Sequence, residues 1–529
     1  MIGASIAGAI SVVVTALSLV APAFGQDETD QRYGTVHFAT SCNETAQRRF
    51  DRGMRYQHSF WYQESQEIFQ DVLKADPECG IAYWGIALSL LYNPHAAPPA
   101  PNLPLGLAAL KSGKAVGAKT QRERDYIDAL TVFYADYDTV PHVQRVKAYL
   151  DAMEDLARKY PSDDEAQIYY AITLNVAASP NDKTYANQLK GAAILEPIFR
   201  RQPHHPGVAH YLIHLYDTPA LAERGLDAAR RYAAIAPAAP HALHMPSHIF
   251  TRVGDWSDSI SSNTASERAA KDSKAFADEL HAMDYLVYAY LQVAQDQKAR
   301  AVTAEMNKVP VNPDQFPGPY ALAASPARCA MERGDWTGAA ALEIRPSKFA
   351  YADAMTYFAR ALGAARTGNR GAAVADIEKL AELREQLRAA NDAYWATQVD
   401  IQWQIAHAWT LDAEGKHEEA LKAMSAAADA EDRSEKHPVT PGAPIPAREL
   451  LGQMLIDRGM AREALAAFEA TLKKQPNRFN AIVGAARAAD SLGDKARAKD
   501  YYQKLTAIAS NADTVRPDLA AARKYLAQN

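Results

Sequence analysis

The sequence predicts an all-α fold, a solenoid of antiparallel helix hairpins with a concave groove. Composition is the first reason: Ala, Leu, Arg, Glu, Gln and Lys dominate, and β-branched runs are scarce after Val20. Length is the second, because 529 residues exceed one compact core and yet no strongly polar linker divides the chain. A solenoid explains both observations, since each repeat needs only its neighbours to bury its apolar face.

The third reason is a 34-residue period in the predicted turns between helices. Gly334 and Gly368 are separated by one such period, and so are Gly459 and Gly493. This period is typical of the tetratricopeptide (TPR) helix hairpin, so the expected fold is a TPR-like α-solenoid. The small residues that follow these turns, with the large aromatic residues after two of them, are Ala339, Ala373, Ala464 with Phe468, and Ala498 with Tyr502.

Residues 1–25 have the pattern of a secretory signal peptide. An uncharged apolar stretch precedes small residues at Ala23 and Gly25, which suit cleavage before Gln26. An uncleaved N-terminal anchor is the alternative, because this segment carries no Lys or Arg. No later stretch is apolar enough to span a bilayer. We therefore expect a periplasmic or secreted protein with no membrane span after signal cleavage.

Two Pro-rich inserts interrupt the predicted array after the signal peptide. Proline removes a backbone donor and clashes with the preceding helical turn, so neither insert is expected to continue a helix. Each insert either folds over the groove or forms an ordinary exposed connection. The predicted parts are 26–91 (N-terminal TPR-like hairpins), 92–106 (first insert), 107–434 (central TPR-like array with a His-rich groove), 435–446 (second insert) and 447–529 (C-terminal TPR repeats and cap).

The three cysteines leave two arrangements open. Cys42 and Cys79 flank the first predicted hairpin, where they could form a disulfide or remain two buried thiols. An exported protein meets an oxidising compartment, which favours the disulfide. Cys329 is expected at a core position of a helix.

Net charge and motifs exclude several function classes. A net charge of −6 and a pI near 6.2 argue against nucleic acid as a partner, because phosphate binding needs a basic surface. The sequence contains no Ser nucleophile elbow, P-loop or dinucleotide fingerprint. Its paired histidines do not form His-Glu-x-x-His, so a zincin-type protease is not supported.

Histidines are concentrated in one region of the chain. Eight of the 15 fall between residues 204 and 281. His210 and His214 form one His-x-x-x-His pair, His244 and His248 form a second pair one 34-residue period later, and His241 precedes the second pair. Residues four apart share one face of a helix, and equivalent positions of consecutive repeats lie side by side. We expect these five imidazoles to meet on the groove side of two neighbouring helices.

Clustered imidazoles predict a transition-metal site. Neutral imidazole is a common ligand of copper, zinc and iron, and these are the expected metals. The lack of an aligned Cys or Met argues against a soft Cu(I) site. Pro246 must either kink the second helix or start it. If the helix starts at Pro246, His241 and His244 lie in the loop before it. Candidate outer partners of the five histidines are Asp217, His281, Asp284 and Tyr288.

Three phrases in the sequence carry a resemblance to a known group. They are His-Tyr-Leu-Ile-His at 210–214, His-Ala-Leu-His-Met-Pro-Ser-His-Ile-Phe at 241–250 and Lys-His-Pro-Val-Thr-Pro-Gly at 436–442. The chain resembles a bacterial group of secreted TPR proteins that share these phrases. Residues 42–85 resemble the same group, so the resemblance covers nearly the whole mature chain. It implies a TPR fold and export, and it implies no particular reaction.

Two functions from different classes follow from these observations. In the first, the groove of an exported TPR scaffold binds a transition metal, as a metal-dependent enzyme for redox or hydrolytic chemistry or without catalysis. In the second, a metal-free scaffold of the cell envelope binds a peptide, a protein or a small molecule in the groove. Spacing identifies no general acid or base, so the sequence leaves catalysis open.

Overall fold

The computed structural model describes residues 31–528, so the predicted signal peptide at 1–25 lies outside the described residues. Within the described part the chain forms α-helices, two short 3-10 helices and connecting loops, and it has no strand. The predicted all-α solenoid is confirmed. None of these helices is long and apolar enough to cross a membrane.

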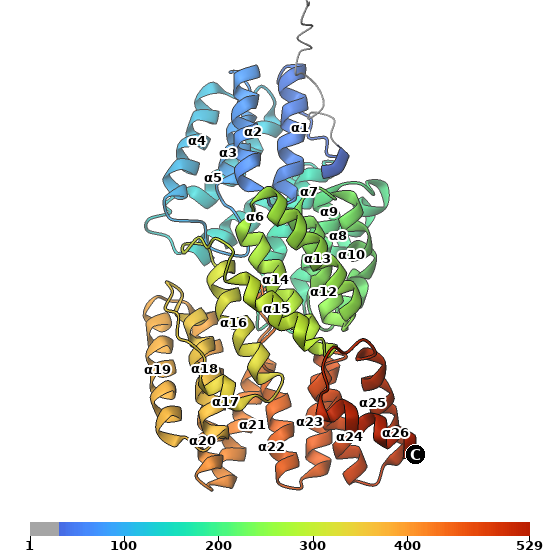
Figure 1. The fold of residues 1–529 in the computed structure, drawn as a ribbon. Coiled ribbons are helices and arrows are strands. Elements are labelled where there is room, and N and C mark those ends of the chain that lie inside the picture. The colour runs from blue at the N-terminus through green and yellow to red at the C-terminus, as the bar shows by residue number, and fades with distance from the viewer. Residues whose placement is uncertain (1–30, 529) are drawn as a thin grey trace, which may run out of the picture.

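The first half of the described chain, blue to green in Figure 1, forms the upper part of the molecule. Consecutive helices pack against each other as hairpins. Their bounds are η1 (Gln31–Tyr33), α1 (Glu44–His58), α2 (Tyr62–Ala75), α3 (Ile81–Ser89), α4 (Asn102–Val116), α5 (Gln121–Tyr134), α6 (His142–Lys159), α7 (Asp164–Val176), α8 (Ala186–Arg201), α9 (Pro206–Tyr216), η2 (Ala222–Gly225), α10 (Leu226–Ile235), α11 (Pro240–His244), α12 (Pro246–Val253) and α13 (Trp256–Ser273).

The second half forms the middle and the lower part, lime to red in Figure 1. It continues the same hairpin pattern to the C-terminus. Its bounds are α14 (Phe276–Gln292), α15 (Asp296–Met306), α16 (Pro317–Met331), α17 (Trp336–Ala340), α18 (Ala350–Arg366), α19 (Arg370–Ala389), α20 (Ala393–Ala413), α21 (His417–Arg433), α22 (Ala447–Asp457), α23 (Ala461–Lys474), α24 (Phe479–Ser491), α25 (Lys495–Ile508) and α26 (Pro517–Gln528).

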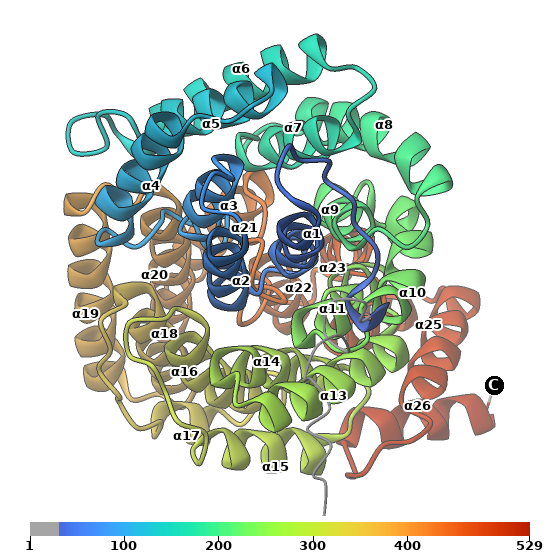
Figure 2. The same ribbon diagram turned by 90° about the horizontal axis from the view of Figure 1, so that it is seen from above.

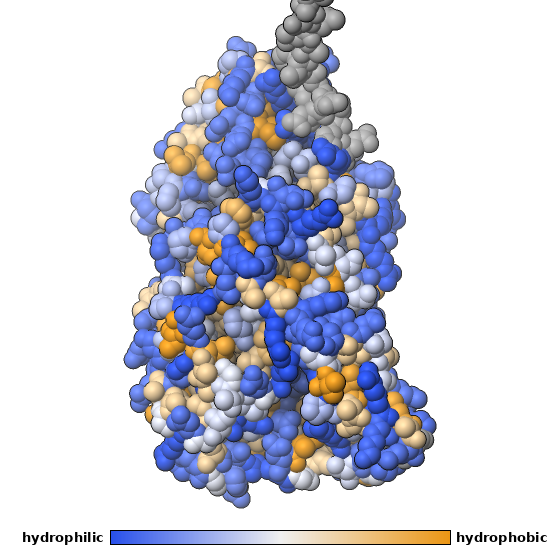
Figure 3. Space-filling view, viewed as in Figure 1, coloured by the Kyte–Doolittle hydropathy of each residue, from blue (hydrophilic) through white to orange (hydrophobic). Residues whose placement is uncertain are grey.

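The solenoid winds as a superhelix that looks like a ring from above (Figure 2), although its first and last helices lie at opposite ends of the molecule (Figure 1). Seen from above, α5, α6, α8, α15, α17 and α19 follow its outside, α14, α16 and α18 lie closer to the centre, and α1 to α3 lie within it (Figure 2). Helix α9 contacts α1 on the inner side of the ring. The inner side is the concave side of the solenoid, and here the first helices of the chain fill part of it. The face in Figure 3 is mainly hydrophilic, with hydrophobic residues in small separate patches.

The predicted turn glycines have the backbone that the repeat requires. Gly334, Gly368, Gly459 and Gly493 have φ between 66° and 78°, a left-handed conformation that glycine adopts without steric cost. The alanines that follow them are fully buried. In the C-terminal repeats the Phe468 ring packs tightly between neighbouring helices at two further glycines, Gly452 and Gly484. The 34-residue pattern therefore reports real hairpin packing.

The first Pro-rich insert is shorter than the sequence predicts. Its non-helical stretch ends at Pro101, and residues 102–106 belong to α4. Pro104 falls in the first turn of α4, where the missing backbone donor costs nothing. The expectation of a non-helical segment through residue 106 is therefore wrong for its last five residues. The second insert has no helix between Arg433 and Ala447.

A buried ion-pair network ties the C-terminal repeats to the middle of the chain. Arg478, which precedes α24, donates to Glu449 on α22 at 2.9 Å and to Glu332 at the end of α16 at 2.5 Å. It also donates to the hydroxyl of Tyr288 on α14 at 3.0 Å. The Arg478 side chain is fully buried, so removal of one partner would leave an uncompensated charge. This network fixes α14 against the lower helices.

Cys42 and Cys79 form a disulfide that closes a 37-residue separation around α1 and α2. Cys329 is a free thiol on α16. By the loop-closure relation, a bridge of this span stabilises the folded state by about 3–4 kcal/mol.

We expect Cys42→Ser/Cys79→Ser to destabilise α1 and α2 by about that amount, because the unfolded segment gains conformational freedom. Hydrogen–deuterium exchange should show faster exchange in these two helices and no change in α22 to α25. Cys329→Ser is the matched control. Equal protection of α1 and α2 with and without the bridge would contradict the expectation.

Candidate metal centre

Helix α9 carries the first histidine pair. Pro206 occupies the first turn of α9, and the His205 ring accepts a hydrogen bond from the Val208 amide as the N-cap. His210 and His214 lie one turn apart on α9, and their exposed fractions are 0% and 8%. All residues of α9 are buried, because neighbouring helices surround it.

The second pair lies on two helices that meet at Pro246. Helix α11 ends at His244, and α12 begins at Pro246. Met245 between them has φ −53° and ψ −35°, which are right-handed helical values. The chain therefore stays helical through the junction, and His241 and His244 lie on α11 and not in an approach loop. His248 follows on α12.

The first group of imidazoles consists of His210, His214 and His241. The Nε2 atom of His210 lies 3.1 Å from Nε2 of His214 and 3.1 Å from Nε2 of His241. Nδ1 of His210 donates to the carbonyl oxygen of His58 at 2.7 Å. This hydrogen bond fixes the ring and directs the Nε2 lone pair toward the other two histidines, as an outer partner does for a metal ligand.

The second group consists of His244, His248 and His281. Nε2 of His244 lies 3.0 Å from Nε2 of His248, and the rings of His244 and His281 have centroids 4.3 Å apart. Nδ1 of His244 donates to Oδ1 of Asn263 at 2.7 Å, and Nδ1 of His248 donates to Asp217 at 3.0 Å. In each group the three candidate ligand atoms lie within 4.8 Å of one another.

The two groups adjoin each other. The shortest ring separations between them are 6.2 Å, from His214 to His248 and from His241 to His244. The structure thus divides the five predicted histidines into three and two. His281 on α14 completes the second three. The sequence suggests it only as an outer partner, although it follows His248 at nearly the repeat length.

The surroundings of all six imidazoles favour the neutral form that binds metals. Burial lowers the pKa of each ring, and the nearby histidines disfavour a second positive charge. The pKa of His210 falls to about 3. The pKa of His248 is also lowered by burial, although Asp217 counteracts the shift.

Asp217 anchors the outer side of the second group. Its carboxylate accepts from His248, from Nε of Arg252 at 2.7 Å and from Nζ of Lys436 at 2.7 Å. Burial opposes its ionisation, but Lys436 and Arg252 outweigh burial and hold the pKa of Asp217 well below its ordinary range. Burial lowers the pKa of Lys436 to about 8 even beside this carboxylate.

Both inserts reach the histidines. In the first insert His95 has its ring centroid 4.5 Å from that of His214, and its buried Nε2 has no hydrogen-bond partner. The second insert supplies Lys436 to Asp217, and its Val439 carbonyl accepts from the Tyr285 hydroxyl at 3.2 Å. The same hydroxyl lies 3.3 Å from Nε2 of His248. The inserts therefore cover the two groups from the concave side.

The other predicted outer partners have different roles. Asp284 pairs with Arg328 and accepts from Ser325 at 3.2 Å, so it serves a buried ion pair. Tyr288 donates to Gln475 at 3.2 Å and belongs to the network of Arg478. Of the four candidates, Asp217 and His281 contact the histidine groups.

A third group of ligating side chains lies nearby. Glu165 on α7 accepts from Nε2 of His58 at 3.0 Å and from Nε2 of His205 at 2.8 Å. Nδ1 of His58 is 3.0 Å from the Tyr211 hydroxyl. Both Nε2 atoms already donate to the carboxylate, so this group joins α1, α7 and α9 by hydrogen bonds. It fixes the His58 carbonyl that orients His210.

Comparisons with known proteins bear on the fold. Residues 480–511 match the tetratricopeptide repeat family. No curated protein matches the sequence. Among solved structures, the human IFIT1 dimer with m7Gppp-AAAA is 11% identical, with a TM-score of 0.39, 86% of this chain covered and 95% of that chain. The APC/C hetero-tetramer Cut9-Hcn1 is 10% identical, with a TM-score of 0.30, 91% of this chain covered and 90% of that chain.

The matched segment coincides with a helix hairpin of the structure. It contains nearly all of α24 and α25, with the turn at Gly493 between them. Gly493 is one of the glycines that define the 34-residue period. The chain is therefore an α-solenoid of the TPR type, with a tetratricopeptide repeat at residues 480–511.

Proposed function

We propose that this TPR solenoid binds two transition-metal ions, one in each three-histidine group. One observation carries the proposal: the ligand atoms of each group converge, while outer hydrogen bonds orient rings in both groups. Three imidazoles with a fourth position open are a known arrangement for a reactive metal ion. Packing alone is a poor explanation for so many enclosed imidazoles, because burying polar rings costs free energy.

Copper and zinc suit these groups best. Each group offers imidazole nitrogens, a donor type that suits copper, zinc, iron and nickel. Neither group contains a carboxylate, as iron sites of the two-histidine type would require, nor a thiolate. An open position on each ion would admit a small exogenous ligand. Two adjacent ions can clamp one substrate between them, so the arrangement is compatible with redox or hydrolytic catalysis.

The proposal includes export to a periplasm or the medium. The Cys42–Cys79 disulfide supports it, because structural disulfides persist mainly in oxidising compartments. A metal-free scaffold that binds a peptide or protein on its concave side is the competing function. It predicts partner binding without stoichiometric metal.

Metal titration tests the proposal directly. Untagged protein freed of metal by a chelator is loaded with Cu(II) or Zn(II), desalted and measured by inductively coupled plasma mass spectrometry. We expect two ions per chain, because there are two separate ligand sets. The variant His204→Ala, which removes an exposed histidine just before α9, should also bind two ions. A value near zero for both metals would refute metal binding and favour the scaffold function.

A further inference from the structure

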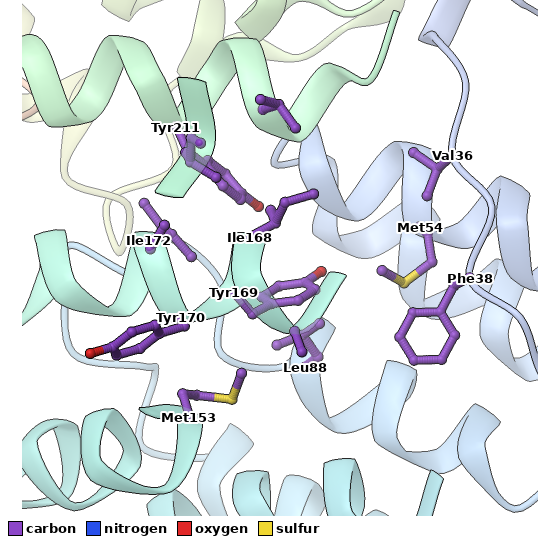
Figure 4. Close-up of a cluster of buried hydrophobic side chains, with 14 of the residues drawn as sticks. Val36, Phe38, Met54, Leu88, Met153, Ile168, Tyr169, Tyr170, Ile172 and Tyr211 are labelled. Carbon is purple, nitrogen blue, oxygen red and sulfur yellow. The ribbon is translucent and has the colours of Figure 1, made fainter. Parts of the chain in front are cut away.

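An apolar cavity lies directly beside the first three-histidine group. Its volume is about 70 Å³, several times the roughly 10–15 Å³ that one water molecule needs. Residues of α6, α7 and the first insert supply much of its wall, and α1, α2, α3, α5 and α9 each contribute a side chain. Aliphatic and aromatic side chains dominate the lining, including Leu88, Ile172 and Tyr211. Figure 4 shows these three residues around Tyr169 in the buried cluster of the upper part.

Three side chains of this apolar lining carry polar atoms without partners. The hydroxyls of Tyr62 and Tyr169 and Nδ1 of His142 are buried and have no hydrogen-bond partner. Tyr62 and Tyr169 are only 8% and 4% exposed. A buried polar group without a partner costs about 1–3 kcal/mol, so three in one cavity require an explanation. A ligand with a polar group would satisfy them.

The cavity and the first histidine group share a wall. Phe60 lines the cavity, and its ring lies 4.3 Å from the His210 ring and 5.1 Å from the His241 ring by centroids. Pro94 and Ala96 also line the cavity and flank His95 in sequence. A molecule in the cavity therefore lies one aromatic ring away from the imidazoles.

Backbone strain maintains this wall. Phe60 has φ 59°, and Tyr92, which also lines the cavity, has φ 58°. Bulky residues adopt this left-handed conformation at a cost and only where the surrounding structure holds them. The Phe60 ring stacks on Tyr62 at 5.2 Å, and Tyr62 contacts Tyr92 at 5.6 Å. These two strained positions and Tyr62 between them present three aromatic rings to one cavity.

We propose that the cavity binds a small aromatic molecule that carries a hydroxyl group, and holds it beside the first three-histidine group. The aromatic rings of the lining match an aromatic ligand. Tyr62, Tyr169 and His142 carry the polar atoms of the lining that have no partner, so they are the groups available to bond the hydroxyl of the ligand. Binding in the cavity is independent of metal, whereas proximity to a metal ion rests on the proposed function.

The first test uses 4-fluorophenol and fluorobenzene as probes of the metal-free full chain, observed by ¹⁹F NMR. We expect saturable one-to-one binding of 4-fluorophenol. Tyr62→Phe/Tyr169→Phe should lower the affinity for 4-fluorophenol about three- to tenfold, which corresponds to the loss of one or two hydrogen bonds. The affinity for fluorobenzene should not change. An equal effect on both probes, or no saturable binding of 4-fluorophenol, would overturn the proposal.

A variant that fills the cavity tests whether 4-fluorophenol binds there. Val176 lines the cavity and is half-buried, so the larger side chain of Val176→Trp should lower the affinity for 4-fluorophenol at least about tenfold. Val143→Trp is the matched control, because Val143 on α6 is 77% exposed and should leave the affinity unchanged. Circular dichroism checks that both variants fold. Equal affinity for folded Val176→Trp and the unmodified chain would place the probe elsewhere and refute the assignment.

A second test measures proximity to the metal. Loading with paramagnetic Co(II) should broaden the ¹⁹F signal of bound 4-fluorophenol far more than loading with diamagnetic Zn(II). Equal line widths in protein shown to contain Co(II) would refute the placement beside the first group. Failure to load either metal would instead refute the proposed function, and the metal-free binding result would stand by itself.

Discussion

Replacing His244 and His248 with alanine is expected to reduce the metal content from two ions per chain to one. The variant loses two of the three imidazoles in the second group, and His281 alone cannot hold an ion in competition with chelating buffer. Loss of an outer partner alone typically lowers metal affinity about 10–100-fold, and loss of two ligands must exceed that. The first group keeps its three rings.

The reciprocal variant, His210→Ala/His214→Ala, should also retain one ion, now in the second group. Mass spectrometry of the metal content, after loading and desalting, distinguishes the two variants from His204→Ala, which should keep two ions. If each double variant lost all metal, the six histidines would form one shared site. A content unchanged by either variant would place the metal outside both groups.

The division into two groups could not be predicted from the sequence. The 34-residue offset correctly places the His pairs on equivalent faces of consecutive repeats, because repeat stacking is periodic. It does not fix which rings share an ion. That depends on the direction of His241, which turns toward His210 at 3.1 Å and leaves His244 to pair with His248. A side-chain rotamer decides this, and spacing carries no information about it.

The sequence also did not show that the two inserts cover the histidine groups. The sequence marks both Pro-rich inserts but leaves open whether they reach the groove. His95 approaches His214 only because the chain turns back over the concave side after α3, and Phe60 takes its place through a left-handed backbone. Long-range contacts of this kind follow from the superhelical winding of the whole chain, which single-repeat patterns do not determine. The histidines are consequently enclosed where an open groove was expected.

Asp217→Asn is expected to lower both the stability of the protein and the metal affinity of the second group. The substitution keeps the shape of the side chain but removes its charge. Lys436 then loses its carboxylate partner, and Arg252 keeps only Glu435 at 3.9 Å. Breaking a buried pair from one side typically costs about 3–5 kcal/mol. The free energy of unfolding of the metal-free protein should fall by that amount near pH 7.

The pH dependence of this difference has a definite sign. The pKa of Asp217 lies below its ordinary range in the folded state, so its stabilising contribution is complete above the unfolded-state pKa of about 3.9. As the pH falls below that value the contribution is lost. The stability gap between Asp217→Asn and the unmodified chain should therefore be constant from about pH 5 to about pH 7 and narrow below about pH 4. Asp227→Asn, on an exposed aspartate, should show no gap.

Metal affinity separates the two roles of Asp217. The carboxylate orients His248 by accepting from its Nδ1. Asp217→Asn should therefore lower the metal affinity of the second group about 10–100-fold and leave the affinity of the first group unchanged. Adding Lys436→Met to the variant removes one unpaired cation, which should restore part of the stability. It does not restore the charged acceptor for His248, because an amide oxygen accepts more weakly than a carboxylate. If Lys436→Met recovered both stability and metal affinity, Asp217 would act only by neutralising charge, and the orientation of His248 would not depend on its hydrogen bond.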